Sequence, residues 1–228
     1  MPLFYQHTIN NSAKIGVWHI EESESFFTEK VPLPVQHISH PHKKLQHLAG
    51  RYLLQELFPG FPYHLIEIAD TRKPFLPNEA YHFSISHCGD YAAVFVSEDN
   101  RVGVDIEIPD KKIDRIQHKF LNDEELEAVQ KLILKRQNLK VYKDSTSTHY
   151  LSLTTHNFHL LTLLWSCKEA VFKWFGDGGV DFRKHIHLQF DNLHNDHGEI
   201  ACVFTKTNNE QLRLSYQKLN TLWLTWVI

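Results

Sequence analysis

Two short segments of the chain carry charged residues at spacings that allow joint chemistry. In RVGVDIEI (101–108), Asp105 and Glu107 stand two residues apart. In a β-strand this spacing places both carboxylates on one face, roughly 6–7 Å apart at the backbone. Mg²⁺ prefers oxygen ligands and is often held by one or two carboxylates together with substrate phosphates. The pair is therefore a candidate Mg²⁺ site, although such pairs also occur on solvated strand faces.

The second segment is HLLTLLWSCKEAVFKWF (159–175), which has the pattern of an amphipathic helix. At about 3.6 residues per turn, its apolar residues gather on one broad side. A narrow polar stripe opposite consists of Thr162, Ser166, Glu169 and Lys173. Because Glu169 and Lys173 are four positions apart, their side chains are neighbours. Such a pair fits either a surface ion pair or part of a polar site.

The elements that must position these residues are short strands and a few helices. We expect helices at residues 45–58, 123–139 and 159–175. We expect strands at residues 4–9, 15–20, 63–68, 81–86, 91–97, 101–108, 186–190, 200–206, 211–217 and 222–227. The three strands between residues 81 and 108 are predicted to form an antiparallel meander. Residues 140–158 are rich in Ser, Thr and His and are predicted to be a loop or an insertion.

This order of elements predicts an α+β protein with two similar lobes. Each lobe would hold a small, mainly antiparallel sheet packed with helices, and the expected boundary separates residues 1–101 from residues 102–228. No internal sequence repeat supports a duplication.

Composition narrows the functional classes. The 228 residues carry a formal net charge of -3, which argues against a general affinity for nucleic acid. No apolar run approaches the roughly 18 residues that a membrane span needs. The three cysteines are far apart, which favours a reducing compartment over a disulfide framework. We therefore expect a cytoplasmic protein that binds neither nucleic acid nor membrane.

Three blocks of sequence, in order, resemble a known family. FSISHCGDYAAVFV, VGVDIE and WSCKEAVFK are similar to the motifs of the Sfp-type 4′-phosphopantetheinyl transferases: a Ser-His step, G-[IV]-D-[IV]-E and W-[ST]-x-K-E-[AS]-x-x-K. RKPFLP (72–77) resembles the family's K-P segment upstream of the Ser-His step. The resemblance spans roughly residues 45–190.

The resemblance implies a two-lobed fold with the active site between the lobes, in a chain that works as a monomer. It implies transfer of phosphopantetheine from coenzyme A to a serine of an apo acyl or peptidyl carrier protein, with release of adenosine 3′,5′-bisphosphate. Asp105, Glu107 and Glu169 would hold Mg²⁺, and Lys173 would offer a positive charge to the phosphates. Glu169, another carboxylate or a metal-bound water could accept the proton of the serine.

The resemblance also suggests which residues contact coenzyme A. Ser86 and His87 form the Ser-His step, and His87 would contact a phosphate. Lys73 is a candidate for a phosphate on the adenosine side, and Arg51 on the first long helix is another candidate. Lys168 matches the K-E step but projects away from the polar stripe, so it has either a phosphate contact or a structural role.

One departure from the family concerns the turn after the last helix. The family often has a Lys-Gly pair there, whereas this chain has Gly176-Asp177-Gly178-Gly179. The missing lysine puts in doubt any carrier or phosphate contact made at that turn. Two other functions stay open: another Mg²⁺-dependent enzyme, such as a nuclease or phosphohydrolase, and a non-catalytic protein that binds coenzyme A.

Overall fold

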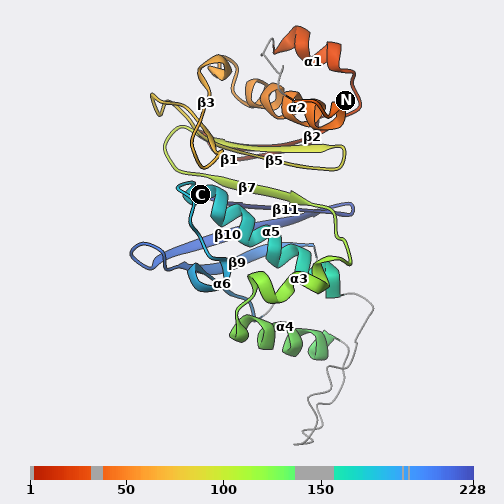
Figure 1. Ribbon diagram of the computed structural model, residues 1–228, viewed down its shortest axis with the longest axis vertical. Coiled ribbons are helices and arrows are strands. Elements are labelled where there is room, and N and C mark those ends of the chain that lie inside the picture. The colour runs from red at the N-terminus through yellow and green to blue at the C-terminus, as the bar shows by residue number, and fades with distance from the viewer. Residues whose placement is uncertain (1–2, 32–37, 137–156, 192, 195) are drawn as a thin grey trace, which may run out of the picture.

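The chain forms two antiparallel sheets, one from each half of the sequence (Figure 1). The computed structural model describes residues 3–31, 38–136, 157–191, 193–194 and 196–228. The first sheet has four strands in the order β1-β2-β6-β5. They are β1 (Leu3–Asn10), β2 (Ala13–His19), β5 (His82–Cys88) and β6 (Tyr91–Ser97).

The second sheet has five strands in the order β7-β11-β10-β9-β8. They are β7 (Gly103–Glu107), β8 (Ile186–Gln189), β9 (His197–Phe204), β10 (Glu210–Leu219) and β11 (Leu222–Val227). Beside the first sheet, β3 (Glu67–Ile68) and β4 (Pro74–Phe75) pair as a small hairpin. The 3₁₀ turn η1 (Tyr63–Leu65) precedes β3. The α+β class predicted from the sequence is therefore confirmed.

Six helices complete the described part of the chain. They are α1 (Glu24–Lys30), α2 (Pro41–Leu57), α3 (Ile113–Phe120), α4 (Asp123–Arg136), α5 (Asn157–Phe175) and α6 (Phe182–His185). Helices α1, α3 and α6 were not expected from the sequence. None of the helices in these described ranges is long and apolar enough to cross a lipid bilayer.

Most expected bounds differ from the structure by a few residues, and the strand expected at residues 63–68 is correct only for Glu67–Ile68, because Tyr63–Leu65 form the turn η1. Helix α2 begins four residues before the expected start at 45, because Pro41 occupies its first turn, where proline needs no amide partner. The expected insertion at residues 140–158 lies outside the described residues except for its last two positions, which begin α5.

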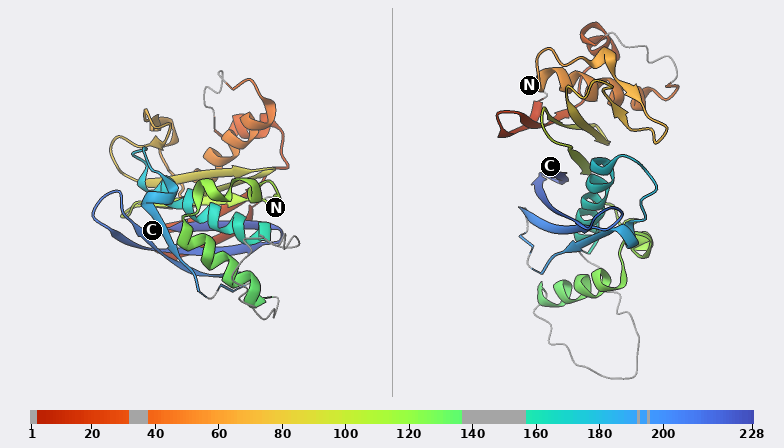
Figure 2. Two further views of the ribbon diagram at one scale, coloured as in Figure 1. Left: turned by 60° about the horizontal axis from the view of Figure 1, so that its bottom comes forward. Right: turned by 90° about the vertical axis from the view of Figure 1, so that its left-hand side faces the viewer.

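Three hydrophobic cores hold the layers together. Helix α2 covers the outer face of the first sheet, where Leu53 and Leu54 pack near Val94. The inner faces of the two sheets share a second core, in which Ile15 and Phe95 belong to the same cluster as Val104. Helix α5 covers the opposite face of β7 and β11, within the third core. The right-hand view of Figure 2 shows the two halves one above the other.

The expected meander is wrong at its third strand. Strands β5 and β6 pair antiparallel as expected, but β7 leaves the first sheet and pairs with β11 in the second. The residues of β7 point as the alternation predicted. Val104 and Ile106 enter the core between the sheets, whereas Gly103 lies against α5.

Alternate side chains of β5 bridge the first sheet to β7. Strand β7 is an edge of its sheet, and a strand edge presents backbone amides without partners in the ladder. The amides of Val104 and Ile106 donate to Ser84 Oγ at 3.1 Å and to Ser86 Oγ at 3.3 Å. Two residues further on, just past the end of β7, the amide of Ile108 donates to Cys88 Sγ at 3.3 Å. We call these three β5 residues the Ser-Ser-Cys ladder.

The ladder predicts a measurable loss of stability when its buried hydroxyl is removed. Ser84→Ala leaves the buried amide of Val104 without an acceptor, which should lower the free energy of unfolding by about 1–3 kcal/mol. Urea unfolding measures this change. Ser25→Ala, at an exposed serine of α1, is the matched control and should change stability by less than about 0.5 kcal/mol. Equal stability of the two variants would contradict the bridging role of Ser84.

Candidate active site

Helix α5 lies directly against β7 because Gly103 has no side chain. A Cβ atom at this position would collide with the backbone carbonyl of Ala170 and with Trp174. The close approach brings the polar stripe of α5 against the polar face of β7. Ser166 Oγ, on the same stripe, shares a hydrogen bond of 2.9 Å with Thr225 Oγ1 of the neighbouring strand β11.

Asp105, Lys173 and Ser86 meet at the centre of this contact. Lys173 Nζ lies 2.7 Å from Asp105 Oδ1 and donates to Ser86 Oγ at 2.8 Å. Ser86 Oγ also donates to Asp105 Oδ1 at 2.8 Å. The Asp105 side chain is 3% exposed and that of Lys173 is 26% exposed, so the pair is open to solvent only on the lysine side.

Glu107 and Glu169 flank this centre and have strongly perturbed acidities. Burial and then the negative charge of Asp105 raise the pKa of Glu169 to about 7, while Lys173 acts in the opposite direction. Burial and Asp105 likewise raise the pKa of Glu107 to about 7, against hydrogen bonds from Cys88 and Trp165 and the charge of Lys173. Three carboxylates thus gather around one lysine, which is an environment that favours an additional cation.

The donor set fits a divalent cation in its chemistry. Asp105 Oδ2 is buried and has no hydrogen-bond partner, so one carboxylate oxygen is free to bind a ligand. All three acidic residues offer the hard oxygen atoms that Mg²⁺ prefers. Within the described ranges, no three His, Cys, Asp or Glu side chains are already arranged to hold a metal ion. The carboxylates are therefore brought together by the fold but are not arranged as a finished metal cage.

Basic groups of α2 and β5 lie beside the carboxylate centre. Gly50 lets α2 approach β5 closely, since a Cβ atom there would press on Ile85 and come within 4.0 Å of the His87 ring. Arg51 follows Gly50, is 7% exposed and makes no ion pair with an acid in the described part of the chain. Partial burial and the positive charges of Lys173, His47 and Arg51 lower the pKa of His87, although part of its ring is exposed. The unneutralised guanidinium favours a bound anion.

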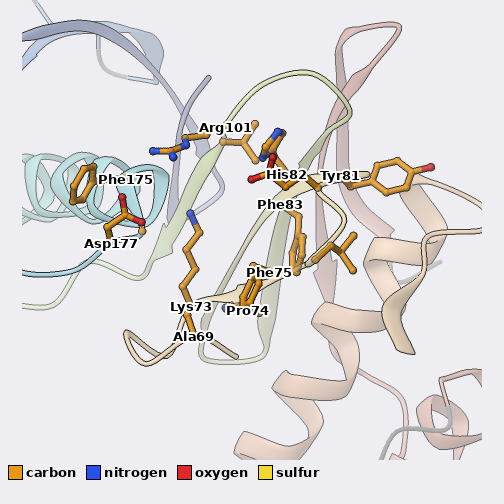
Figure 3. Close-up of a pocket in the computed structure, with 14 residues that line it drawn as sticks. Ala69, Lys73, Pro74, Phe75, Tyr81, His82, Phe83, Arg101, Phe175 and Asp177 are labelled. Carbon is orange, nitrogen blue, oxygen red and sulfur yellow. The ribbon is translucent and has the colours of Figure 1, made fainter. Parts of the chain in front are cut away.

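Lys73 lines two cavities near the Asp105–Lys173 pair. A cavity of about 200 Å³ is lined by both Lys73 and Lys173. A second cavity, of about 250 Å³, lies beyond Lys73, which extends there toward Arg101 and Asp177 (Figure 3). Burial and the charge of Arg101 lower the pKa of Lys73, and Asp177 opposes that change. The first cavity therefore has an ammonium group on two of its walls.

Two predicted contacts to coenzyme A need correction. Lys168 is fully buried, and its ammonium donates to Glu125 Oε2 at 2.6 Å and to the carbonyl oxygens of Phe120, Phe182 and Ile186. It has no donor left for a phosphate, so its role is structural. Ser86 Oγ accepts from Lys173 and from the amide of Ile106 and donates to Asp105, so its hydroxyl is also fully used. In this structure Ser86 therefore joins the ladder to Asp105 and Lys173 and has no free donor for a phosphate.

The turn after α5 is held from both halves of the chain. Gly176, Gly178 and Gly179 all have positive φ, which only glycine adopts without strain. Thr71 Oγ1 donates to the carbonyl of Gly176 at 2.9 Å, and Lys206 Nζ donates to the carbonyls of Gly178 and Gly179. A lysine thus reaches this turn from elsewhere in the chain, although position 177 is Asp.

Cys88 is the main site residue that the sequence reasoning missed. Its thiol donates to Glu107 Oε2 at 3.5 Å while its sulfur accepts from the amide of Ile108. Alternation along FSISHC would have placed Cys88 on the same strand face as Ser84 and Ser86. Cys167, by contrast, is fully buried in the core around α5, as its place on the apolar side predicted.

Comparison with known proteins identifies the family. The family model described as the 4′-phosphopantetheinyl transferase superfamily matches residues 101–227, which is more than half of the chain. The chain therefore belongs to this superfamily and is a transferase of the phosphopantetheinyl type. The matched range contains all three carboxylates and Lys173, whereas Arg51, Lys73 and His87 precede it. No curated protein matches the chain.

The raised pKa of Glu169 predicts how stability depends on pH in metal-free buffer. Its ordinary pKa is 4.5 and its value in the folded protein is about 7, so the folded state binds the proton more tightly. The free energy of unfolding should therefore fall as pH rises from about 4.5 to about 7, by roughly 1–3 kcal/mol for this group. Urea unfolding in EDTA across this window measures the change.

Glu169→Gln should reduce that pH dependence, because the amide does not titrate. The control Glu127→Gln changes an exposed acid of α4 and should leave the pH dependence as it is. An unchanged pH profile in Glu169→Gln would contradict the assignment.

The buried Lys168–Glu125 pair predicts a large stability effect. Lys168→Met leaves Glu125 buried without its ammonium partner, which should lower the free energy of unfolding by about 3–5 kcal/mol. Urea unfolding measures it. Lys131→Met removes a lysine that is 79% exposed in an ion pair with Glu127 and should change stability by less than about 0.5 kcal/mol. A similarly small effect from Lys168→Met would show that the lysine has no structural role.

Proposed function

We propose that this chain transfers 4′-phosphopantetheine from coenzyme A to a serine of an apo acyl or peptidyl carrier protein. The observation that carries the proposal is the meeting of Asp105, Glu107, Glu169 and Lys173 beside a cavity whose walls include a second lysine, Lys73. Carboxylates suited to Mg²⁺ next to lysines suited to phosphate are the combination that phosphoryl transfer needs. Membership of the superfamily supports the transferred group.

Asp105, Glu107 and Glu169 are the residues that we propose to hold Mg²⁺. When bound, the ion supplies neutralisation of negative charge on the phosphate oxygens. The free Oδ2 of Asp105 supports this assignment. Coenzyme A carries a diphosphate and a separate 3′-phosphate, and the basic groups on either side of the carboxylates are placed to bind these anions.

We propose that the first lobe, residues 1–101, supplies most contacts to coenzyme A. Lys73 and Lys173 both line the 200 Å³ cavity and would bind phosphate there. Arg51 and His87 form a second anion site, because Arg51 lacks an acidic partner in the described ranges and His87 faces several cations. Binding of a phosphate there would favour protonation of His87 and so strengthen the contact. The second lobe, residues 102–228, carries the three carboxylates and Lys173.

In the reaction, the carrier serine oxygen attacks the phosphorus atom attached to pantetheine. The bond from this phosphorus to the bridging oxygen breaks, and adenosine 3′,5′-bisphosphate leaves. We propose that Glu169 accepts the serine proton, since it is a half-buried carboxylate that interacts electrostatically with both Asp105 and Lys173. Lys173 stabilises negative charge on the phosphates, and Ser86 holds Asp105 in position through its hydrogen bond. One chain supplies all these groups, which supports a monomeric enzyme.

The proposal predicts a change in the mass of the acceptor. Apo-carrier proteins from fatty-acid, polyketide and peptide synthesis are incubated with the protein, coenzyme A and Mg²⁺, and then weighed. At least one carrier should gain one phosphopantetheine group, and EDTA should prevent the gain. Asp105→Asn should slow transfer by about a hundredfold or more, because it removes a charge from the centre of the site. The matched control Asp110→Asn alters an exposed acid close to β7 and should transfer normally.

Other outcomes point to the other functions. Release of adenosine bisphosphate without any gain of mass by a carrier would indicate a phosphohydrolase. Binding of coenzyme A without either reaction would indicate a non-catalytic binding protein. Full transfer by Asp105→Asn would overturn the assignment of the metal ligands.

A further inference from the structure

The ammonium of Lys173 lies against Asp105, the carboxylate whose negative charge also acts on Glu107 and Glu169. It is 2.7 Å from Asp105 Oδ1 and 2.8 Å from Ser86 Oγ, so two of its hydrogen bonds go to the buried floor of the site. Asp105 keeps its second oxygen without any partner. The ion pair therefore satisfies Oδ1 of this buried carboxylate and leaves Oδ2 without a hydrogen-bond partner in the part of the chain that the structure describes.

Lys173 is also the cation that acts on the two flanking acids. Both Glu107 and Glu169 interact electrostatically with Asp105 and with Lys173, but neither forms an ion pair with any Lys or Arg in the described ranges, since Lys173 is paired with Asp105. Three carboxylates thus depend on one ammonium. This explains why they are close together and yet not arranged as a metal site. With Lys173 on Asp105, one of the two oxygens of this carboxylate is already engaged and its charge is neutralised.

We propose that Lys173 is an exchangeable cation, which neutralises Asp105 in the metal-free protein and is released into the adjoining cavity when a divalent cation binds. The identity of the ion and of the anionic substrate rests on the proposed function. The exchange itself rests on the contacts of Lys173. Its side chain lines the 200 Å³ cavity that Lys73 also lines. A lysine stem is long and flexible enough to move its charge between two such positions without a change in the helix.

The exchange links the binding of metal to the binding of an anion. While Lys173 is paired with Asp105, its charge is largely cancelled and offers little to a phosphate. Once it is released, the cavity has two ammonium groups without a carboxylate partner among the described residues, from Lys173 and from Lys73, which donates only to the carbonyl oxygen of Trp174 at 3.4 Å. A divalent cation and a diphosphate should therefore bind cooperatively, and by linkage each should strengthen the other by the same factor. Lys173 carries this coupling, beyond any direct contact between the metal and the anion.

Calorimetry with Mn²⁺ as the metal and inorganic pyrophosphate as the anion tests the proposal. Lys173→Met removes the competing ammonium and should bind Mn²⁺ about tenfold more tightly than the unaltered protein does. Its pyrophosphate affinity should gain less from Mn²⁺ than that of the unaltered protein. Lys119→Met, which removes an exposed lysine of α3, controls for the general change in charge and should match the unaltered protein. Equal or weaker Mn²⁺ binding by Lys173→Met overturns the exchange.

Asp105→Asn separates this inference from the proposed function. If Asp105→Asn binds Mn²⁺ as well as the unaltered protein, the metal ligands are wrong and the proposed function fails with them. If Asp105→Asn loses Mn²⁺ but Lys173→Met gains no affinity, the proposed function stands and the exchange is wrong.

Chemical labelling gives a readout on the unaltered chain that needs no variant to fold. A brief pulse of acetic anhydride followed by peptide mass spectrometry reports how reactive each lysine amine is. Labelling of Lys173 should rise severalfold when Mn²⁺ is added and fall again with pyrophosphate, while labelling of Lys119 stays constant. Unchanged or reduced labelling of Lys173 on addition of Mn²⁺ overturns the proposal.

Discussion

The open edge of β7 is the constraint on which the arrangement of this protein depends. The outward amides of Val104 and Ile106 are buried away from water, so protein groups must accept their hydrogen bonds. The Ser-Ser-Cys ladder of β5 provides the acceptors. Because the same strand carries Asp105 and Glu107 on its other face, the bonds that satisfy the edge also fix the position of the acidic residues. The same hydrogen bonds therefore join the two halves of the chain and position the residues of the site.

Ser86 shows how closely these two tasks are combined. Its hydroxyl accepts from the amide of Ile106, as the ladder requires, and also contacts both Asp105 and Lys173. The hydroxyl therefore has no free bonding capacity, and a substitution would disturb the seam and the charged centre together. Ser84 has only the ladder bond, so the two serines separate the structural contribution from the catalytic one. Ser84 and Ser86 have the same side chain on the same face of β5, so substitutions of the two can be compared directly.

Local pattern predicted the parts of the site that lie within one element. Alternation in β7 correctly set Gly103 and Val104 on opposite faces, and helical periodicity placed Glu169 and Lys173 on one stripe. Those rules depend only on backbone geometry. Helix α3 was missed because it is short, although Ile113, Ile116 and Phe120 have helical spacing.

Two of the errors have a common physical cause, since each depends on a partner far away in the sequence. Strand β7 looked like the third strand of a meander, but its partner is β11 at the other end of the chain. Lys168 looked available for a phosphate, but Glu125 and three carbonyl oxygens surround it in the folded chain. Whether a charged side chain faces a substrate or an internal partner depends on the tertiary fold, which the pattern of one helix cannot reveal.

The short link between the halves has a practical consequence. Residues 98–101 are exposed and join the last strand of the first sheet to the first strand of the second. The halves are held together elsewhere, by the shared apolar core and by the ladder. If the chain is cut at this link, each of the two fragments still carries the residues through which it contacts the other fragment. Reassembly of the fragments would restore Asp105 and Lys173 on one piece and Ser86 on the other, which makes this architecture suitable for a split enzyme that reports on proximity.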